Sequence, residues 1–348
     1  MYSEVSKGRI EINANLSEVE VKELLANQDL EVIQFKDPVE PGTFQLLNDL
    51  LFHDRDDVEL RAYGFYNKTC DLSFLSLLPN VTRFTVDCIT EVDQLDAILH
   101  LHKLKDLHLG IHHLDSFDIL HSVPATLESI MLEQTKSKKP DLVVLERFSG
   151  LKKLYIESHT KNIDVIGKLH GLEDVTLRSV TTKHLEFLAP LKKLWSLDIK
   201  LGGIHNFSAI EGMDNIKYLE LWQIRGLKDL SFISTLTGLQ YLFLQSLRNV
   251  EALPAFNGLT KLRKVHLEHM MGLKDISSLG HALSLTEFTH WSAMNMSMED
   301  YTSLWSNPAV QRVKANFDNV TRNKEFETTA ERYGKKTELL WRDEFPYE

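Results

Sequence analysis

The most concentrated group of side chains that could bind a metal lies between residues 100 and 113. It contains His100, His102, His108, His112 and His113. A structural zinc site needs about four ligands that converge on one point. The repeat frame described below places His108 on a strand, His112 in the following loop and the first two histidines before the strand. We therefore expect solvated or hydrogen-bonded histidines, and no metal site.

Other candidate chemical groups also lack the spacing that their chemistry requires. The acidic run from Asp54 to Asp57 has neither the glycine nor the distal glutamate of a calcium-binding loop. The chain has no G-x-S-x-G, no phosphate-binding glycine loop, no H-E-x-x-H and no C-x-x-C. Cys70 and Cys88 have no basic neighbour in the sequence that would favour a thiolate. We expect no catalytic residue, no metal and no cofactor, and hence no enzyme.

Composition and charge narrow the possible locations and partners. The 348 residues include 39 Lys and Arg against 50 Asp and Glu, a net charge of −11, and 43% of residues are hydrophobic. The negative charge argues against a nucleic-acid or anionic-membrane partner. No signal peptide or apolar run long enough for a transmembrane helix is evident. With only two cysteines, the sequence predicts a cytoplasmic protein.

An internal repeat accounts for most of the length. Leu104 to Leu109 reads L-x-x-L-x-L, and the same frame recurs along the chain. Neighbouring central apolar positions are 21 to 24 residues apart. These positions are Leu107, Ile130, Leu154, Val175, Leu197, Leu219, Leu242, Val265 and Phe288. The regular spacing predicts a repeat architecture in which neighbouring units stack.

Each repeat is expected to contain one short strand and one tight turn. The L-x-L alternation is typical of a strand with one buried face. The remaining apolar residues, spaced by about three, favour 3-10 turns capped by residues such as Asp71, Asp229 and Asp275. Weaker strands are predicted before this series, around residues 30–35, 58–60 and 81–86, and one after it, around 310–315. Helices are predicted at about 17–28, 43–53, 297–306 and 323–334.

These residues resemble the leucine-rich repeat family over about residues 30 to 315. The phrase from Leu227 to Leu239 is similar to the short-repeat subclass of bacterial internalins and phosphatase-regulating proteins. The asparagine usual in the family after the last strand leucine is absent. Its positions hold Ile89, His112, His159, Val180, Gly202, Ile224, Leu247 and Met270. The resemblance implies an α/β repeat solenoid, a curved horseshoe with a parallel β-sheet on its concave face, short 3-10 turns or helices on its convex face, and helical caps.

The sequence predicts a single solenoid domain over residues 1–348, because no linker interrupts the repeats. Residues 1–56 would form an N-terminal cap and a first irregular repeat. Residues 57–292 would form repeats of 21–25 residues, and residues 293–348 a C-terminal cap.

Side chains that alternate with the buried leucines are expected to line the concave face. In the later repeats they form what we call the aromatic patch. Its residues are Tyr218, Glu220, Trp222, Tyr241, Phe243, Gln245, His266, Glu268 and Trp291. A secondary binding group is predicted at His108, Met131, Tyr155, Glu157, Asp198 and Lys200. Exposed aromatics rimmed by charge are typical of binding sites, although Trp305 or Trp341 could instead cover them.

The sequence therefore predicts a non-enzymatic module that binds a protein partner through its concave face. It would act as a stand-alone regulator, inhibitor or scaffold, monomeric when free. By analogy with the family, it could be a toxin-neutralising, immunity-type protein. An enzyme or enzyme subunit with a polar site around His108, or a surface protein like the internalins, are the alternatives. An open curved surface excludes water poorly, which disfavours the enzyme.

Overall fold

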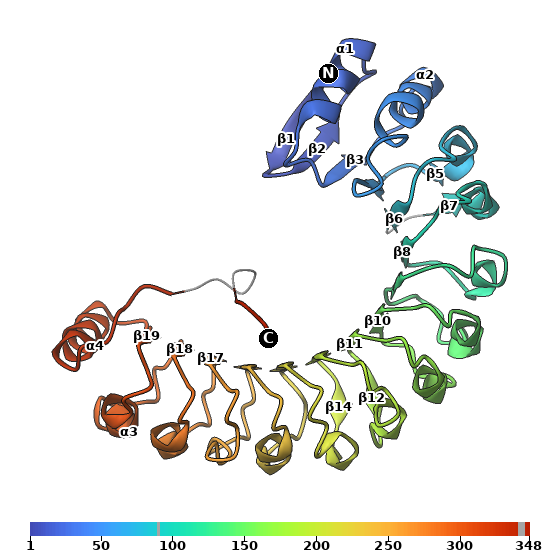
Figure 1. Ribbon diagram of the computed structural model, residues 1–348. Helices are drawn as coiled ribbons and strands as arrows, with labels where there is room; N and C mark the ends of the chain where they lie inside the picture. The colour runs from blue at the N-terminus through green and yellow to red at the C-terminus, as the bar shows by residue number, and fades with distance from the viewer. Residues whose placement is uncertain (89–90, 340–344) are drawn as a thin grey trace. The chain divides into compact units, whose positions relative to one another are not determined.

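The apolar alternations of the sequence form short parallel strands, and the residues between them form 3-10 helices (Figure 1). The structure is a computed structural model that describes residues 1–88, 91–339 and 345–348. It separates into two compact units, Met1–Leu172 and Glu173–Glu348. The single solenoid domain over residues 1–348 stays a prediction. The repeat position Ile89 and the suggested cover Trp341 lie outside the described residues.

In the first unit the sheet has the strand order β1-β2-β3-β4-β6-β8-β9-β10, with β5 and β7 paired separately. Its strands are β1 (Tyr2–Ser6), β2 (Arg9–Ile12), β3 (Val32–Phe35), β4 (Glu59–Gly64), β5 (Cys70–Asp71), β6 (Arg83–Cys88), β7 (Val92–Asp93), β8 (Asp106–Ile111), β9 (Ser129–Leu132) and β10 (Lys153–Glu157). Its helices are α1 (Glu18–Ala26), α2 (Pro41–Leu46), the π-helix η1 (Leu47–Leu51) and the 3-10 helices η2 (Leu72–Leu77), η3 (Leu95–His100), η4 (Asp118–His121), η5 (Leu142–Arg147) and η6 (Ile163–Lys168).

In the second unit the sheet has the order β11-β13-β15-β16-β17-β18-β19, with β12 and β14 paired separately. Its strands are β11 (Asp174–Arg178), β12 (Thr181–Thr182), β13 (Ser196–Lys200), β14 (Gly203–Ile204), β15 (Tyr218–Trp222), β16 (Tyr241–Gln245), β17 (Lys264–Glu268), β18 (Glu287–Trp291) and β19 (Arg312–Ala315). Its helices are the 3-10 helices η7 (Glu186–Leu188), η8 (Ser208–Ile210), η9 (Ser231–Thr235), η10 (Ser277–His281) and η11 (Glu299–Tyr301), with α3 (Thr302–Ser306) and α4 (Val320–Arg332).

The pairing of the strands confirms the repeat frame. Leu107 lies opposite Ile130, and in the second unit Leu219 lies opposite Leu242, which is followed by Val265. The central apolar residues of neighbouring repeats therefore lie opposite each other, because each repeat contributes one strand to the sheet. These central residues are almost wholly buried and form the core between the strands and the 3-10 helices.

The tight turns are capped as the sequence predicts. The side chain of Asp71 accepts a hydrogen bond from the backbone N–H of Ser73, two residues on. Asp229 and Asp275 repeat the arrangement at the starts of their turns. A side-chain oxygen thus satisfies an amide that the short helix leaves without an internal partner.

Residues at the strand ends of the second unit adopt a left-handed backbone conformation. The residues that follow successive strands of the second unit have positive φ angles, and each backbone N–H donates to a carbonyl of the next strand. They are Ser179, Leu201, Gln223, Ser246 and His269. The next positions in the chain, such as Val180, Ile224 and Met270, are then free to fill the core. Backbone bonds therefore connect the turns of this unit.

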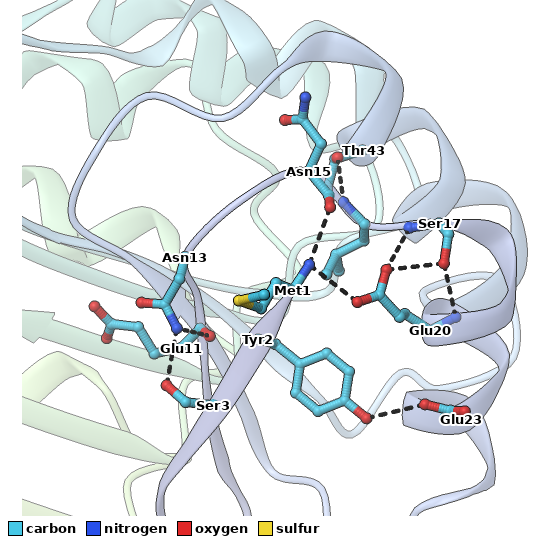
Figure 2. Close-up of polar contacts among 11 residues, drawn as sticks. Met1, Tyr2, Ser3, Glu11, Asn13, Asn15, Ser17, Glu20, Glu23 and Thr43 are labelled. Carbon is cyan, nitrogen blue, oxygen red and sulfur yellow. Dashed lines mark hydrogen bonds and ion pairs between the residues drawn. The ribbon is translucent and has the colours of Figure 1, made fainter.

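The N-terminal cap combines an expected helix with a hairpin that the sequence reading missed. Strands β1 and β2 are antiparallel, with Gly8 at φ +75° in their turn, and β2 pairs in parallel with β3. Ser17 caps α1 in a reciprocal arrangement with Glu20, in which the Ser17 N–H donates to the Glu20 carboxylate at 2.8 Å (Figure 2). That bond, with others, lowers the pKa of Glu20 to about 2.

The other predicted helices exist with shifted bounds. The helix expected at 43–53 begins at Pro41, which is favourable at a first helical position, and continues as the π-helix η1. The helix expected at 297–306 is largely replaced by the 3-10 turn η11 and the short α3. The terminal helix begins at Val320 because Asn319 caps it, and Gly334 follows its end at φ +71°.

Candidate functional site

The side chains of the aromatic patch share one face of the second unit's sheet, the face opposite the 3-10 helices, which we call the inner face. Paired residues form three rows across the strands. The first row is Asp174, Ser196, Tyr218, Tyr241, Lys264, Glu287 and Arg312. The second row is Thr176, Asp198, Glu220, Phe243, His266, Thr289 and Lys314. The third row is Arg178, Lys200, Trp222, Gln245, Glu268 and Trp291.

The expected exposure of Tyr218 and Tyr241 in the first row is wrong. Tyr218 is 0% exposed and Tyr241 3% exposed, although both side chains lie on the inner face. Their rings contact each other edge to face, with centroids 5.2 Å apart. The cover is residues 345–348, which we call the tail segment. Phe345 packs on Tyr241 at 5.3 Å between ring centroids, and Tyr347 approaches Tyr218 at 6.4 Å.

Trp305, one of the two covers suggested from the sequence, does not contact these tyrosines in a ring–ring interaction. Trp305 packs within the C-terminal cap instead, with its ring centroid 4.9 Å from that of Phe326 and stacked on Tyr333 at 5.9 Å. Together with Tyr301, these rings cover the end of the unit beyond β19. The tail segment and the contact between the two rings therefore contribute to the burial of Tyr218 and Tyr241.

A charged network lies beside the buried tyrosines. Lys200 Nζ lies 3.1 Å from both Asp198 Oδ2 and Glu220 Oε1, and the Tyr218 hydroxyl donates to Glu220 Oε2 at 2.8 Å. Asp198 and Glu220 are buried, so their charges require such partners. One ammonium thus contacts both neighbouring carboxylates, and one phenol contacts Glu220.

A second ion pair is buried farther along the first row. Lys264 Nζ lies 2.7 Å from Glu287 Oε1, and 5.0 Å from the centroid of the Tyr241 ring. Burial, with the charge of Lys264, lowers the pKa of neighbouring His266 to about 4. At neutral pH, His266 is therefore an uncharged ring, and it packs against Phe243 with ring centroids 4.4 Å apart.

The rest of the aromatic patch is only half-buried and accessible from the inner face. The residues in this class are Trp222, Phe243, Gln245, His266, Glu268 and Trp291. The Gln245 amide donates to Glu268 Oε1 at 3.1 Å, which orders the polar middle of the third row. The guanidinium of Arg178 lies 5.6 Å from the centroid of the Trp222 ring. This surface offers aromatic rings between fixed polar groups on a rigid sheet.

Comparisons with known proteins identify the fold. An internalin (InlF) of Listeria monocytogenes is structurally similar over 90% of this chain and 87% of its own, with 19% sequence identity and a TM-score of 0.56. The chain has the leucine-rich-repeat fold. A leucine-rich-repeat protein of Leptospira interrogans is 13% identical over 93% of each chain, with a TM-score of 0.44. No family model and no curated protein matches the sequence.

The secondary binding group is distributed over both units of the leucine-rich-repeat chain. His108, Met131 and Tyr155 lie opposite one another on β8, β9 and β10 of the first unit. His108 Nε2 is 2.9 Å from Glu133 Oε1, and the Tyr155 hydroxyl donates to Glu157 Oε2 at 3.3 Å. Asp198 and Lys200 belong to the second unit and to the network described above. The predicted group therefore has members in each of the two units.

The histidine and cysteine candidates gather into no metal site within the described residues. There, no group of three or more His, Cys, Asp or Glu side chains is placed to hold a metal ion. His112 and His113 contact edge to face, with ring centroids 5.3 Å apart. Cys70 and Cys88 are buried free thiols, and the hydrogen bond between them, together with burial, raises the pKa of Cys70.

Sequence reasoning missed the residues that receive the tail segment. Trp195, Gln240 and Arg263 each directly precede a strand, so they fall outside the alternation that marks the inner face. The feature of the sequence that could have indicated them is Phe-Pro-Tyr-Glu at residues 345–348, which has two aromatic residues outside the repeat pattern.

None of the helices in the described part of this leucine-rich-repeat chain combines the length and apolarity needed to cross a membrane.

Proposed function

We propose that this chain is a non-enzymatic protein-interaction module that binds a protein partner through the inner face of its second unit. The observation that carries the proposal is the half-buried aromatic surface of Trp222, Phe243 and Trp291. Aromatic side chains of this kind dominate binding energy at protein interfaces. The leucine-rich-repeat fold supports a role in protein interaction in general terms, while the choice of this surface rests on its composition.

The construction of the surface supports binding rather than packing. Trp222 and Trp291 both lie in the third row, with Gln245 and Glu268 between them. The aromatic rings can exclude water while the amide and carboxylate between them supply directional contacts. Because the side chains stand on hydrogen-bonded strands, little backbone entropy would be lost on binding.

The same features favour a protein as the partner. The net charge of −11 disfavours a nucleic-acid backbone or an anionic membrane. We propose that the module acts as a stand-alone regulator, inhibitor or scaffold, of which a toxin-neutralising protein is one form. A cytoplasmic location remains part of the proposal and is supported by the buried free thiols of Cys70 and Cys88.

Affinity capture from a lysate of the source cells, followed by mass spectrometry, tests the proposal. The unmodified chain is compared with Trp222→Ala and Trp291→Ala variants. Loss of a central aromatic anchor commonly costs about 2 kcal/mol or more of binding free energy. We therefore expect each substitution to weaken a genuine partner about 30-fold, as measured by titration of the purified partner.

Tyr66→Ala is the matched control, because this aromatic residue is 64% exposed and lies in the first unit. We expect it to leave the affinity unchanged, and all variants should retain the circular dichroism of the unmodified chain. A partner that binds the Trp222→Ala and Trp291→Ala variants as tightly as the unmodified chain would contradict the proposal.

A further inference from the structure

The tail segment lies on the inner face of the second unit, at the starts of several strands. Figure 1 shows the end marked C on the strand side of this unit, opposite the 3-10 helices. Phe345 packs against Tyr241 on β16, whereas Tyr347 packs against Tyr218 on β15 and against Trp195 just before β13. The segment therefore crosses neighbouring strands instead of extending the sheet.

Two side chains of the sheet contact the main chain of the segment. The Gln240 side chain donates to the carbonyl of Glu348 at 2.8 Å and accepts from its N–H at 3.0 Å. Arg263 donates to the carbonyl of Pro346. Such bonds depend on an extended backbone and not on the identity of the side chains, as in other modes of peptide recognition.

The side chains of the segment also contact the sheet and each other. The alternate residues Phe345 and Tyr347 pack against the tyrosine rings of the first row. Their own rings also contact each other, with centroids 4.8 Å apart. Arg263 lies over the Phe345 ring at 4.8 Å and forms an ion pair with Glu348 at 3.2 Å. Pro346 between the two rings restricts the backbone to an extended form, which lowers the entropy lost on binding.

The segment is not required as the cap of the repeat. The end of the sheet is already covered by α4, which packs beside β19. The carbonyls beyond α3 are also satisfied, because buried Lys335 Nζ donates to Asn307 O at 2.7 Å and to Val310 O at 2.8 Å. The tail segment lies away from this end, over β15 and β16. Its place on the inner face therefore calls for another explanation.

We infer that Trp195, Tyr218, Gln240, Tyr241 and Arg263 form a recognition site for an extended, acidic peptide of a partner protein, with an aromatic–proline–aromatic sequence. We call this the peptide site. The tail segment occupies it within the same chain as an internal competitor. The inference rests on the proposed function, since the peptide site adjoins Phe243 of the exposed surface. A partner peptide must displace the tail segment before the full inner face is available.

Competition by the tail segment should lower the apparent affinity of the peptide site for an added peptide by a measurable factor. A ligand linked to its site within one chain can have an effective concentration of about 1 mM. If the tail segment is bound in about nine molecules of ten, releasing it raises the apparent affinity for an added peptide about tenfold. The probe is a fluorescein-labelled peptide, Asp-Glu-Phe-Pro-Tyr-Glu, with the sequence of residues 343–348.

Fluorescence polarisation with this probe tests the inference on the full chain. We expect the Phe345→Ala/Tyr347→Ala variant to bind the probe at least about tenfold more tightly than the unmodified chain. Adding Arg263→Ala to that variant should weaken probe binding at least about tenfold. A probe with alanine in place of both aromatics should bind to neither protein.

Glu348→Lys provides a milder release of the tail segment. The Glu348 side chain is 82% exposed and pairs with Arg263, so its reversal repels the segment without disturbing the core. It should also tighten probe binding, and emission from Trp195, which contacts Tyr347, should change in both variants. Sedimentation distinguishes occupancy in cis, which predicts a monomer, from exchange of segments between two copies, which predicts a dimer.

Three results would overturn the inference: equal probe affinity in the released and unmodified chains, no effect of Arg263→Ala, or a dimer held together by exchanged segments. Partner binding that requires Trp222 but ignores the release of the tail segment would also overturn it. That last result would leave the proposed function standing. Conversely, the released chain could bind the probe while partner affinity is insensitive to Trp222, which would contradict the proposed function alone.

Discussion

Removing one member of the buried Lys264–Glu287 pair should destabilise the second unit strongly. The two side chains are only 4% and 3% exposed, and their charged atoms are 2.7 Å apart. Lys264→Met leaves a buried carboxylate without its nearest counter-charge, which commonly costs about 3–5 kcal/mol. Because Arg312 lies opposite Glu287 on β19 and can compensate part of the charge, we expect about 3 kcal/mol.

Tryptophan fluorescence during urea unfolding measures the free energy of unfolding of the second unit. All five tryptophans lie between residues 173 and 348. A loss of about 3 kcal/mol should also lower the melting temperature of the unit by about 6–12 °C. The double variant Lys264→Met/Glu287→Leu removes both charges and fills the space, so its unfolding free energy should return to within about 1 kcal/mol of the original.

Comparing the single with the double variant separates the ion pair from simple loss of packing. If the single substitution costs less than about 1 kcal/mol, the pair is not desolvated as the structure indicates. If the double variant is no more stable than the single one, the loss comes from the shape of Lys264 and not from the unpaired charge of Glu287. Either result would refute the reasoning.

Two further perturbations should affect stability in predictable directions. The pKa of His266 is lowered to about 4, so the unfolded chain binds a proton more readily below pH 6.5 and stability falls from there toward pH 4. From neutral pH to pH 5, the free energy of unfolding should fall by about 2 kcal/mol less in His266→Asn than in the unmodified chain, as measured by denaturant titration. An equal fall in both proteins would contradict this. Gly238→Ala would place Cβ 1.7 Å from Asp214 O and should lower the free energy of unfolding by about 3 kcal/mol. In Gly258→Ala the nearest contact of the new Cβ is 3.8 Å away, so the same measurement should show a loss under about 1 kcal/mol. Similar losses in the two variants would refute the steric argument.

The repeat frame and the membership of the inner face could be predicted from the sequence. Alternation assigns each strand residue to one of two faces, so the spacing of Tyr218 and Trp222 places both on the same face, as their strand pairing confirms. The interval between central apolar residues determines which of them pair. Both signals are local and are repeated many times, so each repeat supports the assignment of the next.

The exposure of that face could not be predicted in the same way. Tyr218 and Trp222 occupy equivalent faces of one strand, yet the first is fully buried and the second only half-buried. The difference depends on the tail segment, which is more than a hundred residues away and has no repeat pattern. Gln240 and Arg263 were missed for a related reason, since they precede their strands and acquire a role only through that long-range contact.

Hydroxyl-radical footprinting of the captured partner complex tests the central claim most directly. The free chain should be oxidised at Trp222, Phe243 and Trp291, which are half-buried on the inner face, and at the more exposed Tyr66 and Tyr333. The account predicts that binding protects the first three residues and leaves Tyr66 and Tyr333 as reactive as before. Protection confined to the outer 3-10 helices, with unchanged oxidation of Trp222 and Trp291, would contradict it.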